Sequence, residues 1–213
     1  MLVTLFNTAQ QPYTEFGRRY NNIMAIYSLK SKEVLSNLTA PANIDLGAMI
    51  PISTTTVGVS GVSSITFSNI PQIYEHLQIR GILRTNSGGN LVVQFNGDTA
   101  TNYSYHSLSA NGSSVTPNSG SSSSELVLQR QEGLSSTSGM FNGFIIDILD
   151  YANTGKYKTL RSLSGVEKNA SGNIDLESGS WRSTAAITSI KLERPTLQQY
   201  STLALYGIKR AGA

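Results

Sequence analysis

Residues 144–163 form two runs of β-forming residues separated by a short loop. In the first run Phe144, Ile146 and Ile148 share one side, because the side chains of a strand point alternately to its two faces. The loop contains Gly155, at a point where a turn after a strand often needs a positive φ. The pattern predicts an antiparallel β-hairpin.

Similar short runs of β-forming residues follow one another through the chain after residue 57. They are separated by turn sequences rich in Gly and Asn, such as Asn96-Gly97-Asp98. The strands predicted in this way are 62–68, 74–84, 91–96, 102–109, 125–131, 139–151, 156–165, 173–181, 186–194 and 200–209. Helical periodicity between them is missing, which argues against a parallel α/β sheet. We therefore expect an all-β domain over residues 53–213, an antiparallel β-sandwich or jelly roll.

The segment 1–52 differs in character from the rest of the chain. An apolar stripe at helical spacing is formed by Phe16, Tyr20, Ile23, Met24 and Tyr27. The stripe predicts a short helix over residues 13–28, and Pro41 and Pro51 bracket a linker-like stretch after it. A segment of this kind has no core of its own. We expect an extended or partly helical arm that assembles against neighbouring proteins through the stripe.

Composition favours contacts with proteins or sugars over contacts with nucleic acid. Charged residues make up only 14% of the chain, and the net charge is +3, so the surface consists mainly of hydroxyls and amides, which are cheaper to desolvate than charges. Lys and Arg occur in pairs but not in clusters, so no nucleic-acid partner is expected. The absence of cysteine excludes disulfides, thiolate nucleophiles and sulfur-ligated metals.

The sequence predicts neither a membrane anchor nor a secretory signal. No apolar run approaches the roughly 20 residues of a membrane-spanning helix. The first residues, Met1 to Phe6, lack the basic region and the small-residue cleavage site of a secretory signal. We therefore expect no membrane partner.

Residues with catalytic chemistry are few. A hydrolase base could only be His76 or His106, and neither accompanies a Gly-x-Ser-x-Gly elbow. Asp147 and Asp150 are three apart in the hairpin, so they point to opposite faces and cannot act as a glycosidase pair. A calcium site formed by oxygen atoms of Asn96, Asp98 and Asp150 is the weaker alternative to ordinary turn roles. We expect a protein without enzymatic activity, metal or cofactor.

Aromatic residues at strand ends offer the most suggestive binding chemistry. An exposed aromatic ring can stack on a sugar or anchor a protein interface. Trp181, Tyr103 and Tyr105 are the candidates for glycan or interface contacts, with core packing as the alternative for each.

Several segments together resemble virion structural proteins of tailed bacteriophages, especially phages of cyanobacteria and other marine bacteria. The matching segments are 65–71 leading into 74–81, 95–98 with 102–106, the hairpin 144–163, 179–187 and 200–209. The resemblance covers roughly residues 55–210. It implies a β-domain that recurs behind different leading segments, with no catalytic residues to carry over. The arm lies outside the resemblance, so we expect it to set the position on the particle.

These observations together predict a protein of the virion. We expect a capsid decoration or cement subunit whose partners are major capsid or tail proteins. No heptads or collagen-like repeats precede the β-domain, which favours a compact subunit over a long fibre. A homo-oligomer is expected; a trimer suits a virion surface protein, but the sequence does not distinguish it from a dimer. The alternatives are a tail or fibre domain that binds host surface glycans and, last, a polysaccharide depolymerase.

Overall fold

The structure is a computed structural model that describes residues 48–87, 89–131, 139–169 and 171–210. The predicted helix 13–28, with its apolar stripe, lies outside the described residues. The strands are β1 Met49–Thr56, β2 Val62–Phe67, β3 His76–Leu83, β4 Gly89–Phe95, β5 Tyr103–Ala110, β6 Val115–Ser123, β7 Leu126–Gln131, β8 Asn142–Leu149, β9 Lys158–Glu167, β10 Gly172–Trp181, β11 Ile190–Leu197 and β12 Thr202–Ile208.

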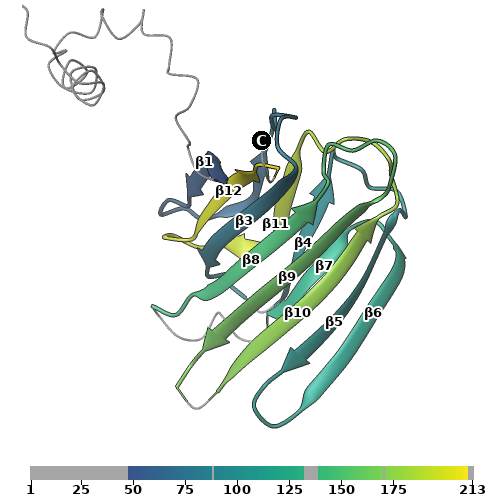
Figure 1. The fold of residues 1–213 in the computed structure, drawn as a ribbon. Helices are drawn as coiled ribbons and strands as arrows, with labels where there is room; N and C mark the ends of the chain where they lie inside the picture. The colour runs from purple at the N-terminus through teal and green to yellow at the C-terminus, as the bar shows by residue number, and fades with distance from the viewer. Residues whose placement is uncertain (1–47, 88, 132–138, 170, 211–213) are drawn as a thin grey trace, which may run out of the picture. The chain divides into compact units, whose positions relative to one another are not determined.

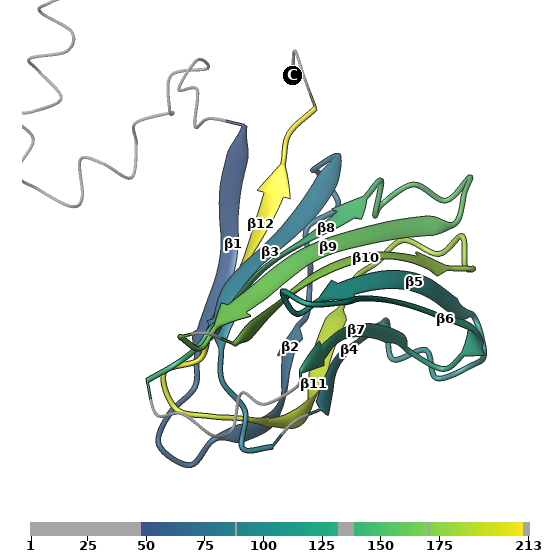
Figure 2. The same cartoon turned by 90° about the horizontal axis from the view of Figure 1, so that it is seen from below.

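The strands form two sheets that face each other. The larger sheet has eight strands in the order β1-β12-β3-β8-β9-β10-β5-β6, and the smaller has four in the order β2-β11-β4-β7. Every pair of neighbouring strands is antiparallel. In Figure 1 the larger sheet lies in front of the smaller one, and Figure 2 shows the curved larger sheet above the smaller one.

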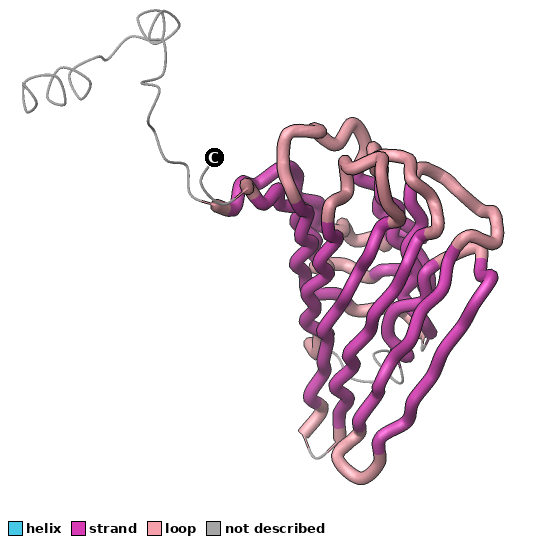
Figure 3. The backbone as a smooth tube through the Cα atoms, turned by 45° about the vertical axis from the view of Figure 1, so that its right-hand side comes forward, coloured by secondary structure: helices cyan, strands magenta, loops and turns pink. Residues whose placement is uncertain are grey.

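The expectation of an all-β antiparallel sandwich is confirmed. In the part of the chain that the structure describes, Figure 3 contains strands and loops and no helix. Each of the ten predicted strands corresponds to an observed one. Successive side chains of each strand point alternately to the inner and outer faces of the sheets, as the period of a strand requires.

Two strands were not predicted, and both lie at the edges of the larger sheet. β6 contains Pro117 and a run of serines, and β1 contains Pro51. The interpretation of Pro51 as part of a linker is wrong, because β1 already pairs with β12 at that point. The expected boundary between residues 52 and 53 therefore lies inside a strand. Proline is tolerated at both positions because an edge strand needs to donate hydrogen bonds on only one side.

β8 and β9 form the predicted hairpin, but its turn uses a different residue. Phe144, Ile146 and Ile148 are all buried, as expected. The residue with positive φ is Asp150, at 48°, and not Gly155. Gly155 instead donates its backbone N–H to the side-chain oxygen of Asn153 at 2.7 Å. The loop is thus shaped by an Asp and an Asn, which tolerate such local hydrogen bonding.

The hydrophobic core fills the space between the two sheets. Its fully buried members include Leu77 and Ile79 of β3, Leu205 of β12 and Leu126 of β7. Leu126 lies against Gly179 of β10, where a Cβ atom would come within 2.6 Å of it, so the smaller sheet packs closely under this part of the larger one. Each such side chain contributes about 1.5–3 kcal/mol by burial.

Candidate functional site

Two of the three aromatic candidates for glycan or interface contacts lie in an internal cluster. Trp181 is 2% exposed and Tyr103 is 0% exposed. Their rings stack with centroids 6.3 Å apart, and Phe95 lies 5.6 Å from Trp181. The prediction that Trp181 and Tyr103 contact glycans or a partner is therefore wrong, because neither ring can reach a ligand in the folded domain.

Asp98 organises the polar side of this cluster. Its carboxylate accepts hydrogen bonds from the indole N–H of Trp181 at 2.7 Å and from the side chain of Asn102 at 2.9 Å. The hydrogen bond from Asn102, with those from Trp181 and the backbone of Ala100, lowers the pKa of Asp98 against the opposing effect of burial. Burial raises the pKa of Tyr103 to about 12. Asp98 therefore has a structural role, because its carboxylate accepts the hydrogen bond of the buried indole N–H.

Tyr105 is partly buried and also packs against the core. Its ring covers Gly120 of β6, where an added Cβ would lie 2.5 Å from ring carbons. The glycine leaves room for the ring, so Tyr105 of β5 packs against the edge strand β6. This contact accounts for Tyr105 without a ligand.

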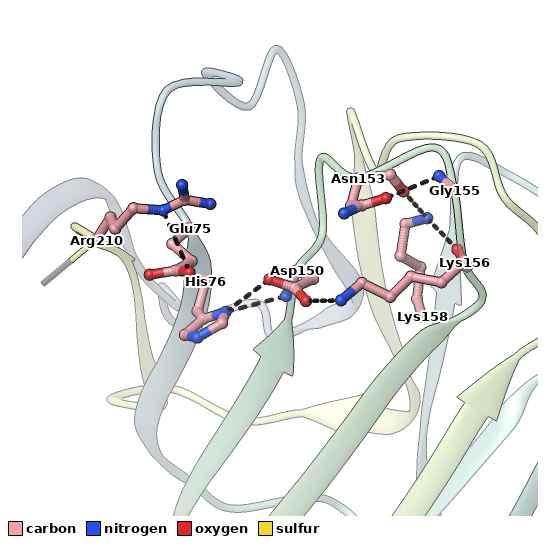
Figure 4. A network of polar contacts seen from close by, with 8 residues as sticks. All are labelled: Glu75, His76, Asp150, Asn153, Gly155, Lys156, Lys158 and Arg210. Atoms are coloured by element: carbon pink, nitrogen blue, oxygen red, sulfur yellow. Dashed lines mark hydrogen bonds and ion pairs between the residues drawn. The ribbon is translucent and has the colours of Figure 1, made fainter.

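A second set of polar residues gathers where β3 meets the turn after β8, as Figure 4 shows. Single ligand atoms of Glu75, His76 and Asp150 lie within 4.8 Å of one another. Their chemistry could suit a metal ion, yet each carboxylate already has a basic partner. Lys156 pairs with Asp150 and Arg210 lies 3.5 Å from Glu75.

The bonding of His76 also points to a structural role. The backbone N–H of Asp150 donates to His76 Nδ1 at 3.0 Å, and the Asp150 carboxylate lies 3.7 Å from the same nitrogen. The hydrogen bond from Lys156 is the largest effect on Asp150, and it lowers the pKa of that carboxyl. The set is thus a group of ion pairs that closes the β8–β9 turn.

The same loop holds a buried lysine. Lys158 is 1% exposed, and its ammonium donates to the backbone carbonyls of Asn153, Lys156 and Thr184 at 2.5, 3.0 and 3.2 Å. Burial lowers its pKa. These three bonds connect the loop to the segment before β11, and they leave the ammonium saturated.

The carboxylates that first suggest catalysis or calcium binding have separate partners. Asp147 accepts from Gln78 at 2.6 Å and from Arg161 at 3.0 Å, whereas Asp150 belongs to the turn. Asn96 accepts from the backbone N–H groups of residues 188 and 189. Asn96, Asp98 and Asp150 therefore serve three different local networks.

The feature that stands out chemically is the outer face of the larger sheet, which carries two adjacent rows of mostly apolar residues. The leucine row runs across β8, β9, β10, β5 and β6 and consists of Ile145, Leu163, Leu176, Leu108 and Pro117. The glycine row begins on β3 and consists of Ile82, Gly143, Gly165, Ile174, Ala110 and Val115. We call the two rows together the apolar patch.

The side chains of the apolar patch are open to solvent. Leu163 and Leu108 are each 49% exposed, and Ile174 and Leu176 are each 55% exposed. Beside the patch lies a polar row, formed by Gln78, Asp147, Arg161, Ser178, His106 and Ser119. An apolar centre with a polar rim is the usual composition of a protein–protein interface.

A shallow hollow lies in the apolar patch. Its volume is about 630 Å³, and its lining includes Gly143, Gly165, Ile145, Leu163 and Ile174. The two glycines are paired across β8 and β9, and a Cβ at Gly143 would meet no atom within 4 Å. The face thus has space over Gly143 beside projecting apolar side chains.

The apolar patch was missed by the sequence analysis although part of its signal was present. Leu163 lies between Ser162 and Ser164, and those serines are buried. Ile174 and Leu176 alternate with Asp175 and Glu177 in the same inverted way. Alternation was visible at these positions, but only the pairing of the strands reveals that the apolar residues face outward.

Comparisons with protein families, with curated proteins and with solved structures find no match to this chain. Within the described residues no helix has the length and hydropathy to cross a membrane.

Proposed function

We propose that this protein is a structural protein of a tailed-bacteriophage virion, a capsid decoration or cement subunit that stabilises the particle by protein–protein contacts. The observation that carries the proposal is the apolar patch on the larger sheet. Large exposed apolar surfaces with a polar rim are uncommon on proteins that act alone and mark sites of interaction. The function is therefore binding without chemistry.

The sequence supports the same role. The resemblance to phage virion proteins covers the segments that form most of the sandwich, including the hairpin of β8 and β9. The low charge of the chain reduces the cost of covering broad surfaces. In this proposal residues 1–52, with Phe16, Tyr20, Ile23 and Tyr27, contact neighbouring capsid proteins and set the position on the particle.

The second candidate is a tail or fibre domain that binds host glycans. Two tyrosines favour it: Tyr157 is 57% exposed and Tyr200 is 65% exposed, so each could stack on a sugar. The burial of Trp181 and Tyr103 removes the aromatic platform on which this alternative first rested. The capsid role remains the better supported of the two.

Mass spectrometry and cryo-electron microscopy of purified particles test the proposal. The expected result is this chain in the particle, with its sandwich resolved on the outer surface of the capsid. Density confined to the tail would replace the capsid role with the second candidate. Absence of the chain from intact particles would overturn the virion role itself.

A further inference from the structure

We propose that a second copy of this chain covers the apolar patch, so that the outer faces of two larger sheets pack together about a two-fold axis. The inference rests on the proposed function, together with the homo-oligomer expected from the sequence, and names the surface through which the copies meet. It can be tested apart from that function, because the contact needs only the purified protein.

The size of the face suits such a contact. From β3 to β6 the sheet presents six adjacent strands, spaced about 4.8 Å apart. The polar row, the leucine row and the glycine row lie about 6.7 Å apart along the strands. Together they outline roughly 600 Å², which is at the lower end of what each partner buries in a stable interface.

The two rows are complementary in size when one copy is turned over. A two-fold axis that lies between the sheets and runs across the strands places β9 antiparallel to β9 of the second copy. If the axis passes over Ser164, Leu163 of each copy faces Gly165 of the other. Ile145 then faces Gly143, whose surroundings leave space for a side chain. Projecting side chains thus meet the hollow.

The same two-fold rotation places other strands of one copy over the same strands of the second copy. β10 lies over β10, so that Leu176 of one copy meets Ile174 of the other. β5 lies over β5, so that Leu108 meets Ala110. Each contact occurs twice, because a two-fold interface uses the same surface on both copies. Two sheets packed in this way would be about 10 Å apart.

The charges beside the patch match in the same register. Along the outer face of β9 the order is Arg161, Leu163, Gly165 and Glu167. Turning one copy over places Arg161, whose side chain is 66% exposed and also pairs with Asp147 of its own copy at 3.0 Å, opposite Glu167 of the second copy. Opposite charges therefore meet at both ends of the contact. A parallel arrangement of the two β9 strands would place Arg161 opposite Arg161 and Glu167 opposite Glu167. The charge pattern therefore favours the antiparallel arrangement.

The first test measures the mass of the full chain in solution. Sedimentation velocity should find a dimer for the wild type. Leu163→Glu, which places two carboxylates in the centre of the contact, should weaken the dimer at least 100-fold and yield monomers. The matched control is Val59→Glu at a residue that is 81% exposed and outside the patch, and it should remain dimeric. Circular dichroism verifies that each variant is folded.

The second test examines the register and does not depend on the fate of Leu163→Glu. Arg161→Glu and Glu167→Arg should each weaken the dimer, because each variant places like charges opposite each other. The double variant Arg161→Glu with Glu167→Arg should restore it. Both residues are exposed, so the substitutions leave the core intact.

Three outcomes would overturn the inference: a wild-type monomer at high concentration, an oligomer of any size that is unaffected by Leu163→Glu, and a double charge variant no tighter than the single ones. A dimer with these properties that is absent from virus particles would leave the inference standing and remove the proposed function. A monomeric protein found on the capsid would overturn the inference and leave the proposed function standing.

Discussion

Asp98 is the acceptor for the only tryptophan of the chain. Asp98→Ala should destabilise the domain by about 1–3 kcal/mol, because the buried indole N–H of Trp181 would lose its partner. Urea denaturation followed by tryptophan fluorescence measures the change. Thr99→Ala, at the exposed neighbouring position, should change the free energy of unfolding by less than about 0.5 kcal/mol. Equal effects of the two substitutions would contradict the structural role of Asp98.

Two aspartates should make stability depend on acid pH. The pKa values of Asp98 and Asp150 are lowered in the folded protein, so the unfolded chain takes up these protons first as the pH falls. The free energy of unfolding should be highest above about pH 4, the ordinary pKa of aspartate, and should fall as the pH drops toward the folded values. Melting temperatures between pH 2 and 6 measure this. Asp98→Asn with Asp150→Asn should flatten the profile, and an unchanged slope would contradict the assignment.

Gly81 and Gly143 lie on neighbouring strands but differ in the space above them. An alanine Cβ at Gly81 would come within 2.6 Å of the backbone oxygen of Thr202 and 2.9 Å of the ring of Phe144. Gly81→Ala should cost about 1–3 kcal/mol, because the backbone of β12 would have to shift. Gly143→Ala, which meets no atom of its own chain, should be neutral or should stabilise the monomer by about 0.5–1 kcal/mol, so the comparison is made in the Leu163→Glu background, where the proposed dimer contact is removed. Urea midpoints of the two variants, measured at one protein concentration, compare them.

The burial of Trp181 could not be predicted from its neighbours in the sequence. The sequence around it, with Ser180 and Arg182 as neighbours, left both core packing and a ligand contact open. The ring faces inward because Trp181 is paired with Tyr103 on one side and with Lys158 on the other. That register includes β5, which is far in the sequence from β9 and β10, so local composition could not determine it.

At the scale of elements, a strand could be predicted from the sequence where it has an alternating pattern of its own. The hairpin of β8 and β9 was predictable because its two strands are adjacent in sequence and one turn sets their register. β6 has little alternation of its own. It pairs with β5 and receives the ring of Tyr105 over Gly120, so its structure comes from a neighbour.

The loop between β8 and β9 depends on Lys158. Lys158→Met should destabilise the domain by about 1–3 kcal/mol, because the buried lysine and its three hydrogen bonds to the carbonyls of Asn153, Lys156 and Thr184 would be lost. Lys156→Met is the matched control: its exposed ion pair with Asp150 should be worth about 0–1 kcal/mol. Chemical denaturation of the two variants measures the difference. A larger loss for Lys156→Met would show that the turn is held by the ion pair instead.

On the scale of the whole molecule, the composition of the core could be predicted but the composition of the outer face could not. Each apolar residue of the patch is flanked in sequence by residues that could as well have faced outward. The patch exists only because strands from residues 82 to 176 align their outward positions in two rows. A candidate interface of this kind is a property of sheet topology, which a single sequence does not contain.

β1 is joined to the sheet only through β12, and this has a mechanical consequence. Met49 pairs with Ile208 and Thr56 with Thr202, so the chain enters β1 and leaves β12 at the same end of the ladder. Tension applied between residues 48 and 209 would load the hydrogen bonds of this ladder one at a time, from that end. β1 would peel away at low force while the remaining strands stay folded, and the domain would yield a short, reversible extension before it unfolds.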